Sequence, residues 1–536
     1  MGSALISSLP LFWCLIPLLL VGFSTRFLKF LKHQILSKSK QTRSLPPGPK
    51  PWPIIGNLPE MLANRPTSRW IHNIMNDLNT EIACIRLGNI HVVTLTSPEI
   101  ACEIMTKQDS VFASRPRNWS SEHVSGGFLS TILVPYGEQW KKMKKVMANE
   151  LVSPKRLQQL QVKRMEESDN LVRYVYNQCN KNGGGLVDVR FVSRHFSGNI
   201  IRRLVFNARH FGKGREDGGP GFEEVEHIDA IFTVLRYLFA FSISDYVPCL
   251  RELDLDGHKK ELKKATKLIT KYHDPLIEDR IQQWKIGKRT HQEDLLDVLI
   301  SLKDAKHNPL LTLDEIKSQI MDMMIATVDN PSNAFEWGLA EMLNQPEIIQ
   351  KATKEIDSVV GKERQVQESD ISKLNYVKAC IREVFRLHPI DDINATHVSM
   401  EDTFVANNTY FIPKGSHVVL RRQGIGQNPR IWKEPFKFKP ERHLEENQDG
   451  FKNLSLNEPS LKLITFGTGR RSCPGMVLGS SMTIMLFARM LHGFEWCVPS
   501  NETTIDLSES EQDTTKAKPL IARAMPRLPE EAYQIS

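Results

Sequence analysis

The sequence predicts a mainly helical protein with a small β-rich lobe, in which a single catalytic domain follows an N-terminal membrane anchor. Three observations predict this architecture: an uncharged apolar run at the amino terminus, one proline-rich segment soon after it, and helical patterns over most of the remaining chain. The chain has 536 residues, 40% of them hydrophobic and 25% charged, which suffices for a large core. No second linker or repeat follows the proline-rich segment, so we expect residues 54–536 to form one domain.

The amino terminus predicts a transmembrane signal-anchor over residues 1–25. Residues 4–23, ALISSLPLFWCLIPLLLVGF, carry no charge, and about 20 apolar residues are enough to cross a bilayer. The basic residues that follow keep this flank in the cytosol under the positive-inside rule: Arg26, Lys29, Lys32, Lys38, Lys40 and Arg43. The alternative, a cleaved secretory signal, is disfavoured because there is no charged start and no small-residue cleavage site.

Residues 26–53 predict a basic, then proline-rich, hinge between the anchor and the domain. Proline fixes φ and excludes helix, so the second half of this segment is expected to be a stiff, extended spacer. Its prolines are Pro46, Pro47, Pro49, Pro51 and Pro53.

Helical signals dominate the expected domain, and β-rich stretches occur near residues 80–96 and 393–420. The segments predicted to be helical are residues 139–150, 155–179, 256–285, 313–344, 346–359, 373–387 and 476–492.

Charge and cysteine content exclude several classes of protein. The net charge of +8 suits a protein near a membrane or one that docks an acidic partner. No block of Lys and Arg is interleaved with aromatic residues, so a nucleic-acid partner is not indicated. The eight cysteines form no CxxC pair, which argues against a disulfide framework and against a zinc site.

The loop FGTGRRSCPG, residues 466–475, places Cys473 among glycines and arginines. Arg470 and Arg471 are expected to favour the thiolate, as are the amides and dipole of the apolar helix that follows. A thiolate in this setting suits iron ligation. A phosphate-binding GxGxxG motif is a poor alternative because Ser472 stands where its third glycine should be. A free cysteine with only a structural role is the simpler alternative.

This loop resembles the haem-binding signature of the cytochrome P-450 superfamily, the haem-thiolate monooxygenases. The matching positions are Phe466, Gly469, Arg471, Cys473 and Gly475. The resemblance implies the cytochrome P-450 fold, a bound haem b (iron protoporphyrin IX), and Cys473 as the axial ligand of its iron.

Two further elements agree with this resemblance in their order along the chain. CIREVFRLHP supplies Glu383 and Arg386, three residues apart on one helix face, and FKPERHL supplies Arg442. In the family, such residues form a buried network behind the haem. Glu383 and Arg386 alone would indicate a solvated salt bridge, but a half-satisfied buried network is costly, so all three are expected together.

PYGEQWKKMKK, residues 135–145, resembles an early helix of the family that meets a haem propionate. This assigns Trp140 and Lys144 to haem binding, and Arg471 and His397 also stand where the family places propionate contacts. The alternative for the lysines is a solvated cationic face, which would attract an acidic redox partner. No dinucleotide fingerprint is present, so the resemblance implies electrons from NADPH–cytochrome P-450 reductase, with the domain on the cytosolic side of the endoplasmic reticulum membrane.

The stretch MMIATVDNPSNAFEWGLAEML, residues 323–343, departs from most of the superfamily. Most members have an acid followed by a threonine that relays protons to bound dioxygen, whereas here Asn330 follows Asp329. Pro331 removes one helical hydrogen bond and frees the carbonyl of Thr327. Asp329 and Asn330 are therefore the candidate catalytic residues; a plain kink is the alternative.

DNPSNAFEWGLAEMLNQPEI, PERH and IPKGSHVVL resemble the plant amino acid N-monooxygenases that form aldoximes for glucosinolates and cyanogenic glucosides. The resemblance implies conversion of an L-amino acid, or a chain-elongated analogue, by two N-hydroxylations, dehydration and decarboxylation. The alternatives are a haem-thiolate enzyme that C-hydroxylates another small molecule, a reductase-independent isomerase or dehydratase, and a non-catalytic haem protein.

Some residues depart from that plant branch. Thr396 stands where the branch usually has proline, Ser472 where it tends to have glycine, and Asp391 and Asp392 where relatives tend to be small or apolar. A solvated turn is the favoured interpretation of the two aspartates, and contact with a substrate ammonium is the alternative. Weaker candidates for binding the substrate carboxylate are Arg117 and His123, although a surface position is the favoured interpretation of each. Met324 and Phe335 are candidates for lining the pocket, with a helical core position as the alternative.

Overall fold

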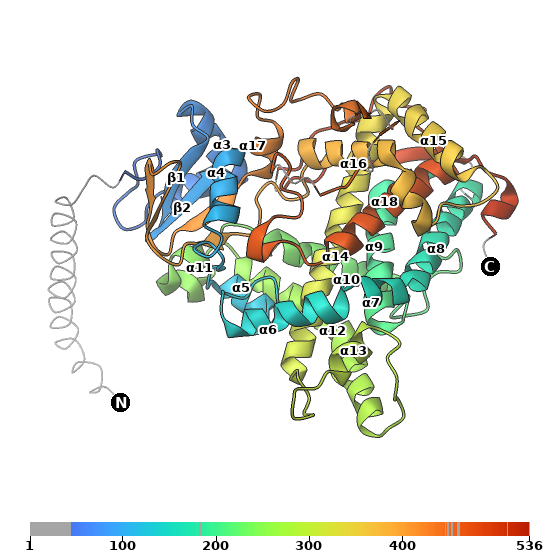
Figure 1. Cartoon of the computed structure of the whole chain (residues 1–536), viewed down its shortest axis with the longest axis horizontal. Coiled ribbons are helices and arrows are strands. Elements are labelled where there is room, and N and C mark those ends of the chain that lie inside the picture. Colours follow the sequence, from blue (N-terminus) through green and yellow to red (C-terminus); the bar gives the residue numbers. More distant parts are fainter. Residues whose placement is uncertain are drawn as a thin grey trace, which may run out of the picture.

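The computed structural model describes residues 44–181, 185–444, 446–447, 450–451, 454–457, 461–511 and 513–534. A large helical lobe lies beside a smaller β-rich lobe (Figure 1), which confirms the predicted fold class. The expected anchor, residues 1–25, and the basic half of the hinge lie outside the described residues. Among the helices that are described, none combines the length and the apolar character needed to span a bilayer.

The longer helices build the helical lobe, in which α14 packs against α9, α10, α16 and α18. These longer helices are α6 (Glu138–Val146), α8 (Gln161–Lys181), α9 (Val189–Phe206), α10 (Phe222–Leu238), α12 (His258–Lys285), α14 (Leu313–Leu343), α15 (Pro346–Val360), α16 (Asn375–Leu387) and α18 (Met476–Gly493).

Shorter helical segments connect the long helices or cover the sheet. They are α2 (Leu58–Ala63), α3 (Thr67–Asp77), α4 (Pro98–Cys102), η2 (Glu103–Lys107), α5 (Trp119–Val124), η3 (Met147–Leu151), α7 (Pro154–Gln159), α11 (Ile243–Tyr246), η4 (Pro248–Leu253), α13 (Leu295–Ser301), η5 (Glu368–Lys373), α17 (Arg422–Gly426), η6 (Pro440–His443), η7 (Gly469–Arg471) and η8 (Glu530–Ala532).

The main sheet joins segments that are more than 300 residues apart in the chain. Its order is β1-β2-β7-β4: β1 (Ile82–Leu87) and β2 (Ile90–Leu95) form a hairpin, β2 pairs in parallel with β7 (His417–Leu420), and β7 pairs antiparallel with β4 (His397–Val398). Pairing with β7 fixes the backbone of His397. The smaller sheets are β10 (Phe494–Cys497) with β11 (Ile521–Pro526) and β3 (Leu186–Asp188), β5 (Thr403–Val405) with β6 (Tyr410–Ile412), and β8 (Glu446–Asn447) with β9 (Gly450–Phe451).

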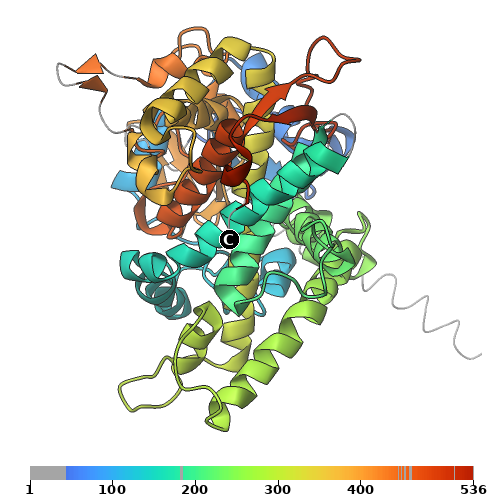
Figure 2. The same cartoon turned by 90° about the vertical axis from the view of Figure 1, so that its right-hand side faces the viewer.

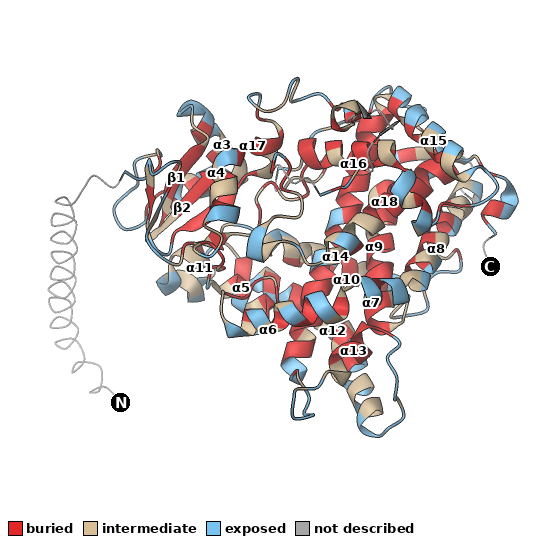
Figure 3. Ribbon diagram, in the orientation of Figure 1, coloured by how far each residue is buried: buried red, intermediate tan, exposed pale blue. Residues whose placement is uncertain are grey.

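Helix α14 is the buried spine of the helical lobe (Figure 3). It begins with the predicted capping box, in which the amide of Glu315 donates to Thr312 Oγ1 at 3.2 Å and the amide of Thr312 donates to Glu315 Oε2 at 2.9 Å. Gly338 lets α18 and α16 approach closely, because a Cβ there would lie 2.6 Å from the Phe487 ring and 3.0 Å from Val384. The helix continues without interruption through Pro331.

Most expected helices are present, but two long helices, α9 and α10, were not predicted. Residues of α9 are buried on nearly every side, so the helix lacks the polar face that gives an amphipathic pattern. The segment predicted as residues 155–179 is broken at Leu160 between α7 and α8. The segment predicted as residues 139–150 changes from α-helix to a π-helical turn at Met147.

The described part of the proline-rich hinge lies along the β-rich lobe. The carbonyl of Pro47 accepts from the amide of Cys84 in β1 at 2.8 Å, and the carbonyl of Ser44 accepts from Phe411 in β6 at 2.8 Å. Gly48 allows this close approach, since a Cβ there would lie 1.8 Å from the Cys84 oxygen. The end of the hinge is therefore attached to the domain by backbone hydrogen bonds.

Buried histidines lie between α9, α10 and α12. His227 Nε2 and His273 Nε2 are 2.8 Å apart, and His195 is buried nearby on α9. Burial, followed by the charge of Arg202, lowers the pKa of His273 and the pKa of His195 from 6.5 to about 3. These rings are neutral in the folded protein, and protonation favours the unfolded chain.

We therefore expect the stability of the protein to fall as the pH drops from about 6.5 towards about 3, by about 1.4 kcal/mol per pH unit for each such group. His273→Gln removes one titrating ring, so urea unfolding should show a smaller loss of stability between about pH 7 and about pH 5. His291→Gln, at a side chain that is 73% exposed, is the matched control. An unchanged slope in His273→Gln would contradict this assignment.

Candidate active site

The Cys473 loop closes on itself in front of α18. The amide of Cys473 donates to the carbonyl of Phe466 at 2.8 Å, and the ring of Phe466 meets Phe385 of α16 edge-on at 6.4 Å. Gly469 has φ +69°, and a Cβ there would lie 2.4 Å from the carbonyl oxygen of Met105, so this position requires glycine. Cys473 is exposed in the protein alone.

The source of positive charge at Cys473 differs from the prediction. Although part of Cys473 is exposed, desolvation by the surrounding protein raises the pKa of its thiol, while a hydrogen bond from the Gly475 amide and the charge of Arg422 act to lower it. Arg470 instead pairs with Asp109 at 2.5 Å, and Arg471 donates to the backbone carbonyls of Ala113 and Val134. The prediction that Arg470 and Arg471 favour the thiolate was therefore wrong: Asp109 and two backbone carbonyls bind these side chains, and the charge that acts on the sulfur is that of Arg422.

Arg471 joins the Cys473 loop to two other segments. Its Nε donates to the carbonyl of Ala113 at 2.6 Å and its Nη2 to the carbonyl of Val134 at 2.7 Å. Its guanidinium lies 4.4 Å from the ring centroid of buried Trp140. Burial, followed by the charge of Arg115, lowers the pKa of Arg471 to about 8.

Arg115 is a functional candidate that the sequence analysis missed. It is 9% exposed and donates to the carbonyls of Ala395 at 2.5 Å and Thr396 at 3.0 Å. Burial, followed by the charge of Arg422, lowers the pKa of Arg115 to about 10. In the sequence it is one of two arginines, with Arg117, in the segment before α5, and no periodicity distinguishes it from a surface residue.

Lys144 and His397 lie close to this pair of arginines. Lys144 Nζ donates to the carbonyl of Arg470 and lies 5.1 Å from the Trp140 ring centroid. His397 is buried, and its Nδ1 is 2.7 Å from the carbonyl oxygen of Phe112. Burial, followed by the charge of Arg115, lowers the pKa of His397 well below its usual range. The structure thus brings together all the residues predicted to contact the propionates.

These residues fit a haem. Among the described residues, neither Arg115 nor Arg471 has a carboxylate partner, and Arg471 Nη1 is buried without a hydrogen bond. Uncompensated buried charge is strongly unfavourable, so the arrangement favours a ligand with negative groups at this point. The two propionates of a haem would supply them, and Cys473 would offer an accessible sulfur to its iron.

The predicted network behind this site is present as a set of buried ion pairs. Arg386 binds Glu383 through two hydrogen bonds of 2.8 and 2.9 Å, and Arg442 Nε lies 3.0 Å from Glu383 Oε1. His443 Nε2 lies 2.7 Å from Glu383 Oε2, a contact that the sequence analysis did not predict. Burial alone would raise the pKa of Glu383, but hydrogen bonds from His443 and Arg386 outweigh it and lower the pKa to about 2.

The middle of α14 carries a short exposed window in an otherwise buried stretch. Ala326 and Asn330, one turn apart, are exposed, while Met324, Val328 and Asp329 are buried. Asn330 Nδ2 donates to the carbonyl of Ala326 at 2.9 Å. The turns of α14 on both sides of this window lie in the core.

Asp329 is buried beside this window. The side chain of Asn333 donates to its Oδ1. Burial, followed by the charge of Asp391, raises the pKa of Asp329 well above its usual range. Asp329 therefore holds its proton to a higher pH than an ordinary carboxyl, which suits a group that delivers protons.

The two aspartates after α16 are not a solvated turn. Asp392 is 5% exposed and forms an ion pair with Arg421 at 2.7 Å; the turn prediction was wrong because its partner lies 29 residues further along the chain. Asp391 is half-buried. Burial raises the pKa of its carboxyl, and the charge of Arg422 opposes this shift without cancelling it. Contact of Asp391 with a substrate ammonium stays a prediction.

The weaker candidates for substrate selection occupy surface or core positions. Arg117 is exposed and lies 5.5 Å from the Phe128 ring centroid, and His123 Nε2 is 2.9 Å from Thr266 Oγ1. Met324 is fully buried, and Phe335 meets Phe487 of α18 edge-on at 5.1 Å.

An accessible thiol before α18, uncompensated arginines beside it and a buried ion-pair network behind it define a haem-thiolate protein. Comparison with known proteins agrees: the family model for Cytochrome P450 matches residues 46–522, and the chain belongs to this family.

Its relatives include several plant enzymes of similar length. The chain is 58% identical to Isoleucine N-monooxygenase 1 of Lotus japonicus over 520 residues, which cover 96% of each protein. It is 55% identical to Tyrosine N-monooxygenase of Sorghum bicolor, over 91% of this chain and 87% of the relative. It is 51% identical to Phenylalanine N-monooxygenase of Arabidopsis thaliana, over 99% of this chain and all of the relative.

The ion-pair network leads to a prediction about stability. Glu383→Gln keeps the shape of the side chain but leaves the charges of Arg386 and Arg442 without a buried partner, so we expect a loss of about 3–5 kcal/mol. Urea unfolding of the haem-loaded protein measures it. Glu347→Gln, at an exposed position of α15, is the control; equal stability of the two variants would contradict the prediction.

Proposed function

We propose that this protein is an amino acid N-monooxygenase that converts an L-amino acid, or a chain-elongated analogue, to its aldoxime. The reaction comprises two N-hydroxylations, a dehydration and a decarboxylation. The observation that carries this proposal is identity of 51–58% over almost the whole chain to relatives named as N-monooxygenases of amino acids.

The haem, when bound, supplies the activation of dioxygen at its iron. Cys473 would bind that iron as a thiolate, and Arg115, Arg471, His397, Trp140 and Lys144 would hold the propionate side. The carbonyl contacts of Arg471 and Arg115 connect the Cys473 loop to the segments that contain Ala113, Val134 and Thr396. These hydrogen bonds orient both guanidinium groups before the haem arrives.

On α14, the chain's own residues handle the proton. Asp329 holds a proton close to the exposed window because its pKa is raised. Pro331 has no amide hydrogen, so the carbonyl of Thr327 lacks its helical donor and can accept a hydrogen bond from water or from a substrate amine. Asn330 keeps its side-chain amide on the carbonyl of Ala326, which leaves this position without the hydroxyl that relays protons in most of the superfamily.

We further propose that electrons come from NADPH–cytochrome P-450 reductase and that residues 1–25 anchor the protein in the endoplasmic reticulum membrane. The basic helix α6 supports a partner of acidic character. Lys142 pairs with Glu315 and Lys141 with Glu138, each at 2.7 Å, and Lys141 and Lys145 are the exposed lysines of the helix. The uncharged run of residues 4–23 and the basic residues behind it support a single span with the domain in the cytosol.

Co-expression with a plant reductase in yeast microsomes tests the function directly. With a pool of amino acids and NADPH, we expect oximes that mass spectrometry identifies. Cys473→Ala should abolish both the red-shifted carbon monoxide band of the reduced protein and all oxime, whereas Cys497→Ala, the control, should change neither. A protein with normal haem content that makes no oxime from any amino acid would refute the proposal; product without NADPH would favour an isomerase or dehydratase.

Asn330→Thr tests the role of the exposed window on α14. A hydroxyl there offers the proton relay of other members, so the ratio of oxime formed to NADPH consumed should change, by about twofold or more. Ser332→Ala, two residues further along on the buried side of the helix, is the control. An identical ratio in wild type and Asn330→Thr would remove Asn330 from the list of functional residues.

A further inference from the structure

Asp391 carries a carboxylate to which the described residues offer no partner. The residue is half-buried, and no hydrogen bond or ion pair to its side chain occurs in the part of the chain that the structure describes. Both of its oxygens keep accessible surface, whereas Oδ1 of the neighbouring Asp392 is enclosed by the protein. A ligand can therefore reach the carboxylate of Asp391.

Hydrogen bonds on both sides of Asp391 fix its place. The carbonyl of Ile390 accepts from Thr514 Oγ1 at 2.7 Å, and the carbonyl of the residue after Asp391 accepts from the amide of Arg422 at 2.6 Å. Trp337 of α14 donates through Nε1 to the carbonyl of Thr514 at 3.0 Å. The backbone at Asp391 is thus tied to α14 on one side and to α17 on the other.

The charges around Asp391 place it between α14 and the Cys473 loop. Its own charge acts on Asp329 of α14, and the charge of Arg422 acts both on Asp391 and on the Cys473 thiol. Such effects weaken with distance and with screening by solvent. A cation bound to Asp391 would therefore lie near the exposed window of α14 and near the sulfur assigned to the iron.

Three carboxylates close to Asp391 already have partners. The pairs are Asp392 with Arg421 at 2.7 Å, Asp513 with Arg236 at 3.6 Å, and Asp329 with the side-chain amide of Asn333. Asp391 differs, because within the described residues only the charge of Arg422 offsets its own, and the Cys473 thiolate competes for that same charge. The arrangement leaves a negative charge that a further cation would stabilise.

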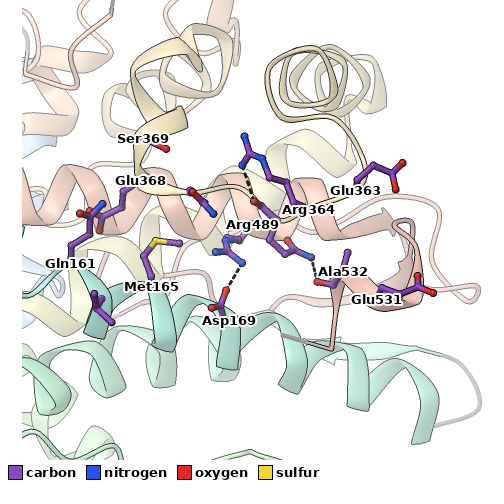
Figure 4. A pocket seen from close by; sticks show the side chains of 13 residues that line it. Gln161, Met165, Asp169, Glu363, Arg364, Glu368, Ser369, Arg489, Glu531 and Ala532 are labelled. Atoms are coloured by element: carbon purple, nitrogen blue, oxygen red, sulfur yellow. Dashed lines mark hydrogen bonds and ion pairs between the residues drawn. The ribbon is translucent and has the colours of Figure 1, made fainter. Parts of the chain in front are cut away.

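The cavity of about 480 Å³ towards the carboxyl end of α18, where α18 and α8 run side by side (Figure 2), is a contrasting case. Its half-buried carboxylates are paired at 2.7 Å, Asp169 with Arg489 (Figure 4) and Glu368 with Arg164. Its other carboxylates, Glu363 and Glu531, are exposed to solvent. Among the described residues, the acidic groups of that cavity are therefore compensated without a ligand.

We infer that Asp391 binds the α-ammonium group of the amino acid substrate. Its carboxylate accepts hydrogen bonds from the ammonium and holds the nitrogen, the atom to be hydroxylated, near the window of α14. Because relatives tend to have a small or apolar residue at this position, the contact is particular to this chain. The inference rests on the proposed function, since it names the residue that recognises one group of that substrate.

A thermodynamic cycle between Asp391 and the ammonium tests the inference. Calorimetry of the full-length, haem-loaded protein in lipid nanodiscs measures the binding of L-isoleucine and of its 2-hydroxy acid, which has a hydroxyl in place of the ammonium. The wild type should bind the amino acid about tenfold or more tightly than the hydroxy acid. The other common amino acids, each with its own hydroxy acid, are tested in the same way.

Asp391→Asn should lose this preference, while its affinity for the hydroxy acid changes by less than about twofold, because only the pairing of two charges is removed. Asp391→Ala should lose the preference as well. Asp314→Asn, at an exposed position of α14, is the matched control and should keep it. The carbon monoxide band of each reduced variant verifies that its haem site is intact.

Three results would overturn the inference: equal weakening of both ligands in Asp391→Asn, an unchanged preference in that variant, or no binding by any amino acid. Oxime formation separates this inference from the proposed function. A protein that makes oxime but keeps its preference in Asp391→Asn refutes the inference alone. Loss of the preference in Asp391→Asn, in a protein that makes no oxime, supports the contact and refutes the reaction alone.

Discussion

Two arginines to which the described residues offer no carboxylate, the buried Arg115 and the half-buried Arg471, impose the constraint on which the rest of the site depends. A buried charge costs several kcal/mol unless it is compensated, and carbonyl contacts compensate these two only in part. These carbonyls belong to Ala113, to Val134 and to the pair Ala395 and Thr396, which lie in three separate segments of the chain. The need to neutralise this charge therefore links the Cys473 loop, the segment before α5 and the strand that holds His397 to one ligand.

Helix α14 combines two requirements that normally conflict. As the spine of the helical lobe it must be buried and continuous, which Gly338 and the Thr312 cap support. As one wall of the site it must expose polar backbone, which a regular helix conceals. Proline at position 331 reconciles them, because it frees one carbonyl beside the exposed window without ending the helix.

Short motifs made much of this site predictable, and long-range pairings made the rest unpredictable. Glu383 and Arg386 lie on one helix turn, so their pairing follows from spacing. The errors concern partners that no local pattern identifies. Asp392 pairs with Arg421, and the charge that acts on Cys473 is that of Arg422 rather than that of Arg470. Arg115 donates to carbonyls some 280 residues away in the chain. Helix α9 was missed for a related reason, since burial on all sides removes the polar face that reveals a helix.

The two ends of α18 use buried arginine in opposite ways. Near Cys473, Arg471 has no described carboxylate partner and its pKa falls to about 8, so that end favours a ligand with net negative charge. At the other end Arg489 is already paired with Asp169. An anion would gain little there and would meet the exposed carboxylates of Glu363 and Glu531. The two ends of the helix therefore differ in whether the arginine has a carboxylate of its own.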